Sequence, residues 1–187
     1  MVSVPLHRIG GRFYRAVLVG RVERALDPPG PQSAGRYHRL GEKALYMSPE
    51  ADWACIAVGN YMAEDRLPRL IVPLELDEAC VLDQRDEAAC AALGIDRELS
   101  KVRWRPELAA GREPPSWRNS DAARAAGADG IIDCSRGIVG GWHLTLFRWN
   151  EPGGPQVRLA GEPVACDYEA SRARWAAPAS WSLPAFR

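Results

Sequence analysis

The segment Gly35–Glu50, with the sequence GRYHRLGEKALYMSPE, constrains the fold most strongly. It begins with polar and turn-forming residues, continues into a short apolar run at positions 44–47, and ends in Ser-Pro-Glu. An apolar run between turn signals is typical of a short buried strand. Ser48 is a predicted helix N-cap and Pro49 a predicted first helical residue, because a helix leaves the nitrogen at that position without a partner. The segment therefore predicts a loop, a strand and a helix in immediate succession.

Four side chains of this segment are candidates for a binding site. Arg36, Tyr37 and His38 lie on the loop that leads into the strand, and Tyr46 lies on the strand itself. A fixed scaffold that carries such side chains on its approach loop is a common pocket for an anionic ligand. Each residue also has an ordinary interpretation. Arg36 would then be a surface arginine, Tyr46 a core tyrosine with a bonded hydroxyl, and His38 an exposed loop histidine.

Composition limits the classes of function. The 187 residues suffice for one domain with a core, and the 47% of hydrophobic residues exclude a disordered chain. The 24 basic and 24 acidic side chains balance, which argues against direct nucleic-acid binding, since that needs a basic surface. Lys43 and Lys101 are the only lysines, so nearly every positive charge is an arginine, the side chain best suited to phosphate.

The cysteines and the apolar runs indicate the compartment. Five cysteines occur, an odd number, and no two have the C-x-x-C spacing; they are Cys55, Cys80, Cys90, Cys134 and Cys166. This pattern favours neither a disulfide framework nor a zinc site, so we expect buried thiols in a reducing compartment. No apolar run approaches the roughly 20 residues that span a membrane, and the first residues lack the apolar region of a signal peptide. We expect a cytoplasmic protein with no metal site and no membrane contact.

Short strands and helices follow one another without strict alternation. The predicted strands cover 13–19, 44–47, 69–76, 81–82, 130–133 and 142–149, with two more near 156–160 and 163–167. Pro73 places the strand at 69–76 near an edge or at a bulge. The predicted helices cover 49–64, 85–93, 96–102 and 120–126, the last capped by Asn119 or Ser120, whereas 21–34 and 104–117 predict irregular structure. This pattern predicts one α+β domain over 1–187. The tail at 169–187 has no clear period, and its Trp175, Trp181 and Phe186 indicate packing on the body or on a partner.

Two further polar residues lie in or beside predicted strands. Arg15 is inside the first strand, where a charged side chain lies either on a solvent face or in a polar pocket. Ser135 follows the strand at 130–133 on a glycine-rich loop, either as an ordinary loop serine or as part of a site. The chain has no G-x-G-x-x-G after a strand, no Walker motif, no H-E-x-x-H and no G-x-S-x-G. The residues alone therefore predict an α+β domain with a candidate anion pocket.

Three short segments follow one another in a fixed order. The first is Arg15 inside the opening strand. The second is the turn Gly35-Arg36-Tyr37, followed by the strand ALYMS at 44–48. The third is GADGIIDCS at 127–135, followed by two glycines at 140–141 and a Leu-Phe pair at 146–147. Together the segments resemble the RES domain, the toxin half of a bacterial toxin–antitoxin family, and they span 13–149, which we take as the core of the domain.

The resemblance implies a fold similar to the diphtheria-toxin-like ADP-ribosyltransferases, with a split, mostly antiparallel β core flanked by helices. It implies NAD+ as the substrate, cleaved between nicotinamide and ribose, and no metal. ADP-ribose would pass to a protein side chain, to phosphate or to water. A small helix-turn-helix antitoxin is the implied partner, and a target protein could be the acceptor.

The resemblance also assigns roles to individual residues. Arg15 and Arg36 would grip the NAD+ phosphates, as bidentate donors can. Tyr46 would stack on the nicotinamide or its ribose, and Ser135 would hydrogen-bond the same end of the ligand. Tyr37 is a further candidate contact to NAD+.

The chain departs from the family pattern in two places. The family has a glutamate in the helix after the tyrosine strand, but the matching position holds Ala57, and neither Glu50 nor Glu64 fits the spacing. Such a carboxylate stabilises the positive charge on ribose as nicotinamide leaves, or activates the acceptor. Where the family often has Arg-Trp-Asn, the chain has Arg-Tyr-His, so we expect His38 at the mouth of the pocket as a hydrogen-bonding group or base. The alternative function is a catalytically inactive RES-like domain that binds NAD+ or a partner protein.

Overall fold

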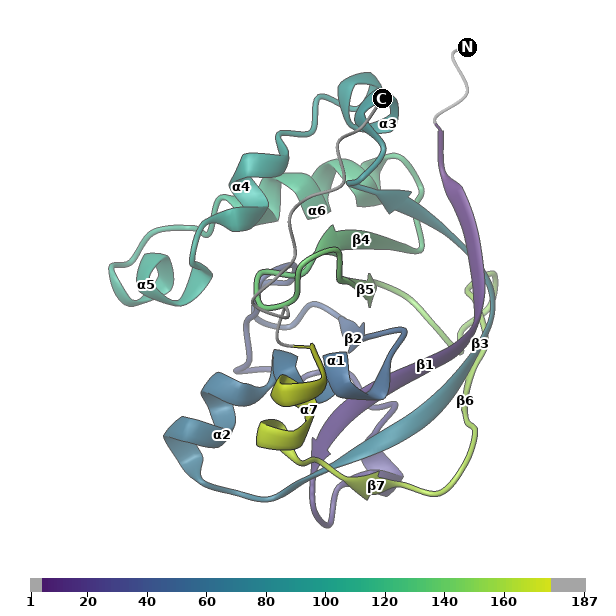
Figure 1. Ribbon diagram of the computed structural model, residues 1–187. Coiled ribbons are helices and arrows are strands. Elements are labelled where there is room, and N and C mark those ends of the chain that lie inside the picture. Colours follow the sequence, from purple (N-terminus) through teal and green to yellow (C-terminus); the bar gives the residue numbers. More distant parts are fainter. Residues whose placement is uncertain (1–4, 176–187) are drawn as a thin grey trace, which may run out of the picture.

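The computed structural model describes residues 5–175, whose strands form one seven-stranded sheet (Figure 1). The strands are β1 (His7–Leu18), β2 (Leu45–Met47), β3 (Arg69–Asp83), β4 (Gly130–Cys134), β5 (Trp142–Leu146), β6 (Val157–Leu159) and β7 (Val164–Ala165). Their order is β1-β3-β4-β5-β2, and β6 and β7 each pair with β3 outside this path. The strands predicted near 156–160 and 163–167 are therefore present.

Two antiparallel halves make up the sheet. In one half β1 pairs with β3, and in the other β4, β5 and β2 pair in succession. The halves join where positions 81–83 of β3 run parallel to positions 130–132 of β4. A second connection links Tyr14 of β1 to Ser48, just after β2, through backbone hydrogen bonds of 2.8 and 2.9 Å. The predicted α+β class and the split, mostly antiparallel core are confirmed.

The strand β3 is longer than predicted, because the strands expected at 69–76 and 81–82 are one strand. Opposite the middle of β3, before the joint, β1 has a bulge between Ile9 and Gly11. Gly10 approaches β3 so closely there that a Cβ atom would lie 3.0 Å from the Asp77 carbonyl oxygen, which explains the glycine. Pro73 lies inside β3, not at an edge or a bulge, between the segments that pair with β7 and β6.

The helices gather in two groups. They are α1 (Ala51–Ala57), α2 (Gly59–Asp65), α3 (Glu87–Ala92), α4 (Arg97–Lys101), α5 (Trp104–Ala109), α6 (Ser116–Ala125) and α7 (Tyr168–Trp175), and a short 3-10 helix covers Val22–Arg24. In Figure 1, α3 to α6 lie together beside and above β4, and α1, α2 and α7 lie together below them. The helices predicted at 85–93 and 96–102 correspond to α3 and α4.

The helix predicted over 49–64 is wrong in two respects. Its N-cap is Glu50 and not Ser48, because the backbone of Ser48 is hydrogen-bonded to β1. The helix also breaks at Val58 into α1 and α2. At the break, Gly59 lets the ring of Tyr168 pack so closely that a Cβ atom would lie 2.2 Å from a ring carbon. Contact with α7 therefore coincides with the break.

Two predictions after residue 100 are also wrong. The region 104–117, predicted as irregular, contains α5. The helix α6 begins at Ser116, so Asn119 and Ser120 are buried inside it instead of capping it. Asn119 donates hydrogen bonds to Gln84 and to the Asp96 carbonyl, which explains a buried amide within a helix.

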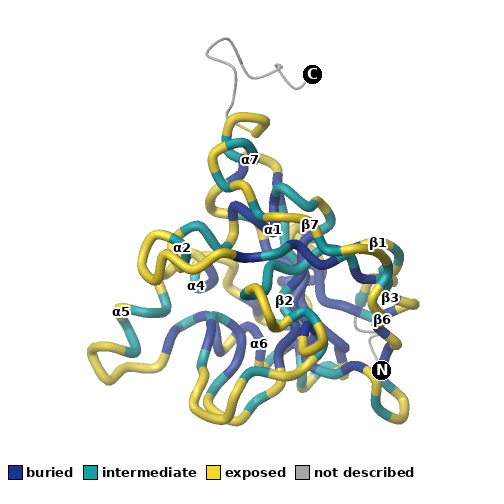
Figure 2. Tube along the Cα trace, turned by 90° about the horizontal axis from the view of Figure 1, so that it is seen from below, coloured by how far each residue is buried: buried dark blue, intermediate teal, exposed yellow. Residues whose placement is uncertain are grey.

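Buried residues from both halves of the sheet form the main core. Figure 2 colours every buried stretch of the trace dark blue. On β2, Leu45 and Met47 enter this core, whereas Tyr46 between them packs against a second cluster. That cluster includes Tyr37, and Ile131 of β4. Alternation along a strand thus places Tyr46 on the face away from the main core.

The chain contains a disulfide between Cys55 on α1 and Cys166 just before α7, with Cα atoms 5.5 Å apart. The expectation that all cysteines are thiols is therefore wrong. An odd count and the lack of close spacing do not exclude one bond between residues 111 positions apart. Of the other three, Cys90 is buried as predicted, and Cys134 is exposed.

The start of the aromatic tail packs on the body. The rings of Trp175 and Trp53 meet edge to face with centroids 5.1 Å apart, and Arg174 forms an ion pair with Asp52 of α1. The tail is helical as far as Trp175, although the sequence shows no period there. The predicted packing of Trp181 and Phe186 concerns positions outside the described residues.

Candidate functional site

Tyr46 joins the strand β2 to the loop that precedes it. Its hydroxyl accepts a hydrogen bond of 3.0 Å from the Tyr37 backbone N–H and lies 2.8 Å from Nδ1 of His38. A Cβ atom on Gly35 would lie 2.4 Å from the His38 ring and 2.7 Å from the Tyr46 hydroxyl oxygen. The Gly-Arg-aromatic turn therefore needs its glycine so that the loop can close over Tyr46.

We predicted His38 at the mouth of a pocket, or else as an exposed loop histidine. The structure shows neither. His38 is only 3% exposed, and burial lowers its pKa to about 4. The imidazole is therefore neutral at pH 7, and its Nδ1 and the Tyr46 hydroxyl share a hydrogen bond. This buried histidine positions Tyr46 and is poorly placed to act as a base.

Arg15 and Arg36 reach the surroundings of Tyr46 from two distant segments. Arg15 donates to the Ala25 carbonyl at 2.8 Å, and burial lowers its pKa to about 10. Arg36 donates to the carbonyls of Ser100 and Val102, at 2.5 and 2.8 Å, and burial and then the charge of Arg136 lower its pKa. Arg15 follows Tyr14, whose backbone bonds to Ser48 two residues after Tyr46, and Arg36 precedes Tyr37, whose N–H donates to the Tyr46 hydroxyl.

Ser135 lies on the loop after β4. Its N–H donates to the Gly141 carbonyl at 2.8 Å, and its Oγ accepts from the Gly137 N–H at 3.3 Å. These bonds close the glycine-rich loop, and within residues 5–175 they are the hydrogen bonds that Ser135 makes. The structure thus brings Arg15, Arg36, Tyr37, His38 and Tyr46 together and places Ser135 on a neighbouring loop, without a direct contact to Tyr46.

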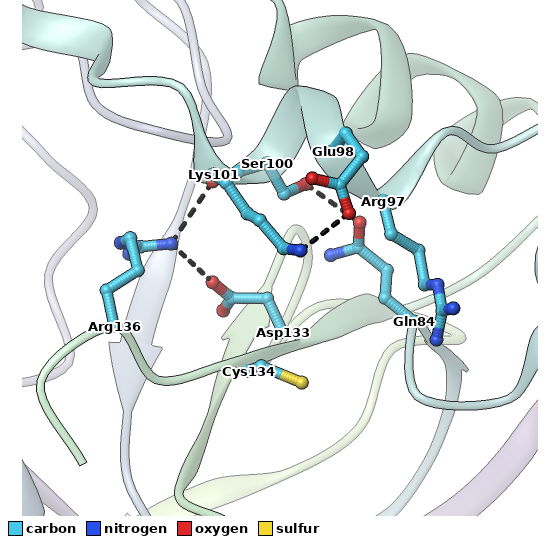
Figure 3. A pocket seen from close by; sticks show the side chains of 8 residues that line it. All are labelled: Gln84, Arg97, Glu98, Ser100, Lys101, Asp133, Cys134 and Arg136. Atoms are coloured by element: carbon cyan, nitrogen blue, oxygen red, sulfur yellow. Dashed lines mark hydrogen bonds and ion pairs between the residues drawn. The ribbon is translucent and has the colours of Figure 1, made fainter. Parts of the chain in front are cut away.

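A pocket of about 180 Å³ opens between α4 and the end of β4 (Figure 3). It is lined by Gln84, Arg97, Glu98, Ser100, Lys101, Asp133, Cys134 and Arg136. The carbonyl of Ser100 accepts from both Arg36 and Arg136, so one backbone oxygen connects the pocket to the arginine that the sequence predicts. Three of the lining side chains are cationic and two are acidic, and each cation is paired with a carboxylate: Arg97 with Glu87, Lys101 with Glu98 and Arg136 with Asp133.

Comparison with known proteins assigns the chain to a family. The family model of the RES domain matches residues 5–169. The chain belongs to the RES domain family. The resemblance drawn from the sequence is thereby confirmed, and it extends beyond the expected core of 13–149.

A solved structure with a similar fold is described as the crystal structure of the M. tuberculosis MbcT-MbcA toxin-antitoxin complex. The TM-score is 0.59 with 16% sequence identity, and the match covers 91% of this chain and 92% of that chain. A comparison with curated proteins gives no match.

In this RES domain, the position expected to hold the family glutamate offers no carboxylate. Ala57 is exposed at the end of α1. Glu50 is exposed at the start of the same helix, and Glu64 is exposed and paired with Arg105. Neither glutamate lies in the surroundings of Tyr46.

Sequence reasoning missed a row of polar residues in the same RES domain. Tyr46, Thr145 and Ile131 lie side by side on neighbouring strands and form one row across the sheet. A second row, on the same face and two residues further along each chain segment, consists of Ser48, His143 and Asp133. Asp133 is the register partner of His143, and Nδ1 of His143 lies 2.8 Å from Oγ of Ser48. A charged residue inside the apolar run GIIDC was a signal of the same kind that singled out Arg15.

Two other features are absent from residues 5–175. No helix there is long and apolar enough to cross a membrane. No group of three or more His, Cys, Asp or Glu side chains is arranged there to hold a metal ion.

Proposed function

We propose that this RES domain is the toxin of a toxin–antitoxin pair and consumes NAD+ by cleaving the bond between nicotinamide and ribose. The observation that supports this best is the pair of partly buried arginines, Arg15 and Arg36, beside Tyr46. Membership of the RES domain family and the fold shared with a toxin–antitoxin complex favour the same function.

The two arginines are suited to the phosphates of NAD+. Each donates to backbone carbonyls, and within the described part of the chain neither Arg15 nor Arg36 forms an ion pair with a carboxylate. A guanidinium out of water without an anionic partner is costly, and burial lowers the pKa of both groups. A phosphate would supply the missing negative charge and accept two hydrogen bonds from each guanidinium.

The ring of Tyr46 then offers a stacking surface for the nicotinamide end, with its hydroxyl held by Tyr37 and His38. Ser135 is proposed to donate a hydrogen bond to the same end. As the carbon–nitrogen bond breaks, its electron pair leaves with nicotinamide, which becomes neutral, and ribose carries a transient positive charge. A protein side chain, phosphate or water captures this cation and releases a proton where the acceptor carries one.

The proposed partner is a small helix-turn-helix antitoxin, with both proteins in the cytoplasm. The support for a partner is the similar fold seen in a toxin–antitoxin complex.

The direct test is NAD+ turnover by the purified chain, freed of any antitoxin. NAD+ and its products are followed by mass spectrometry in buffer, with added phosphate, and with a cell lysate. We expect ADP-ribose, phosphorylated ADP-ribose or labelled protein, depending on the acceptor. Unchanged NAD+ under all three conditions would contradict the proposal.

A matched pair of variants tests the role of Arg15. Arg15→Ala should lower kcat/KM by roughly 10- to 150-fold, because a hydrogen bond to a charged group contributes about 1.5–3 kcal/mol. Arg12→Ala should leave turnover unchanged, because Arg12 is an exposed arginine on the same strand, paired with Glu75. Equal loss in both variants would mean that Arg15 does not hold the substrate.

A domain that binds NAD+ without turnover is the second candidate, favoured by the alanine at position 57. It predicts binding of NAD+ by calorimetry with no product under any of the three conditions.

A further inference from the structure

We infer that Asp133 is the catalytic carboxylate of this site, which stabilises the positive charge on ribose as nicotinamide leaves. The inference rests on the proposed function and names the group that supplies the negative charge, which Ala57, Glu50 and Glu64 do not. Three features of the structure carry it: the unbonded oxygen of Asp133, its position in the pocket, and its position relative to Tyr46.

The hydrogen bonding of Asp133 differs from that of the other buried aspartates in the described chain, Asp83 and Asp129. Both oxygens of Asp83 bond to Arg85. Those of Asp129 bond to Arg148 and to the Cys80 N–H. The side chain of Asp133 is 6% exposed, and its Oδ2 accepts from Arg136 at 3.2 Å, whereas its Oδ1 has no hydrogen-bond partner among residues 5–175. This oxygen is not fully buried, so it is open to solvent or to a ligand in the pocket.

The position of Asp133 gives that oxygen access to a ligand. Asp133 lines the pocket, and in Figure 3 its carboxylate points toward Arg136, beneath the side chain of Lys101. Arg136 and Arg36 donate to the same carbonyl, of Ser100, at 3.1 and 2.5 Å. The carboxylate therefore lies beside Arg136 and close to Arg36, one of the two arginines proposed to hold the phosphates of a substrate.

Asp133 and Tyr46 also share a face of the sheet. The row Ser48, His143 and Asp133 runs beside the row Tyr46, Thr145 and Ile131, two residues along each strand. A ligand stacked on the Tyr46 ring and extended toward Arg36 would pass over the Asp133 row. The electrostatic influence of Asp133 on both Tyr46 and Arg36 agrees with this proximity.

The chemistry required of Asp133 is electrostatic. The carbon–nitrogen bond breaks and both electrons go to nicotinamide, so the positive charge of the ring passes to the ribose carbon and oxygen. An ionised carboxylate close to this charge lowers the barrier without forming a bond or transferring a proton. With water as the acceptor, the products are nicotinamide, ADP-ribose and one proton.

The test compares Asp133→Asn with Asp83→Asn, a change of a buried strand aspartate that does not line the pocket. The readouts are kcat and KM for NAD+, NAD+ binding by calorimetry, and the melting temperature. We expect Asp133→Asn to lower kcat by at least about 100-fold, as for the loss of a preorganised electrostatic group. Its NAD+ binding should stay within about three-fold of wild type, and Asp83→Asn should keep wild-type kcat.

The outcomes separate this inference from the proposed function. No turnover by the wild type overturns both. Wild-type kcat in Asp133→Asn, beside an active wild type, overturns the role of Asp133 alone. If Asp133→Asn does not fold, Asp133→Ala is assayed with and without formate. Restoration of turnover by formate supports the inference, and wild-type turnover without formate, or no restoration with it, overturns it.

Discussion

At the scale of single residues, the hydrogen bonds that each polar side chain makes decide its place in the candidate site. Arg15, Arg36 and Tyr46 could be predicted as candidates, because an arginine within a strand and a tyrosine between turn signals are visible in the sequence. The burial of His38 could not, because it follows from the fold of one loop over the Tyr46 hydroxyl. Asp133 was not predicted as a site residue, because its position near Tyr46 follows from the strand that pairs with β4.

His38 predicts a loss of stability in acid. Its pKa is about 4 in the folded chain and about 6.5 when unfolded, so between these values the unfolded chain binds more protons. Stability is therefore complete above pH 6.5 and falls as the pH drops toward 4. Between pH 7 and pH 5 the free energy of unfolding should decrease by about 2 kcal/mol from this group.

Urea unfolding of wild type and His38→Asn at both pH values measures the effect. Asparagine can still accept the hydrogen bond of the Tyr46 hydroxyl but does not titrate. The pH dependence of the variant should be smaller by about 2 kcal/mol. Equal pH dependence in the two proteins would show that His38 titrates normally.

At the scale of elements, long-range contacts decide what local patterns do not. The strands follow from alternation and from apolar runs between turn signals, which are local patterns. In the structure, Asp86 and Asp96 cap α3 and α4. The break between α1 and α2 coincides with the contact of Gly59 with Tyr168 of α7, 109 positions apart in sequence numbering. The same pair of segments carries the disulfide.

The disulfide predicts that reductant destabilises the packing of α7 on α1. Reduction of Cys55–Cys166, or Cys55→Ser with Cys166→Ser, should lower the free energy of unfolding by about 2–4 kcal/mol, since the bond closes a long loop. Chemical unfolding with and without reductant measures this. Cys80→Ser, which changes a free thiol, should keep the sensitivity to reductant. An unchanged stability of the reduced wild type would contradict the prediction.

At the scale of the whole molecule, two antiparallel halves meet at a short parallel contact, with the candidate site on one face of this sheet. The resemblance to the RES domain, carried by three short segments in order, implied a split, mostly antiparallel core, but not the parallel contact that joins its halves. Residue spacing alone reached only the α+β class. It could not place β4 beside β3, since a parallel pairing joins segments about 50 residues apart.

The central claim, that this RES domain arrests growth by consuming NAD+, is tested most directly inside a bacterium. The chain is induced without an antitoxin, and NAD+ is measured by mass spectrometry while growth is recorded. NAD+ should fall before growth stops, Arg36→Ala should abolish both effects, and Arg12→Ala should retain both. Growth arrest by the wild type with NAD+ unchanged would contradict the claim.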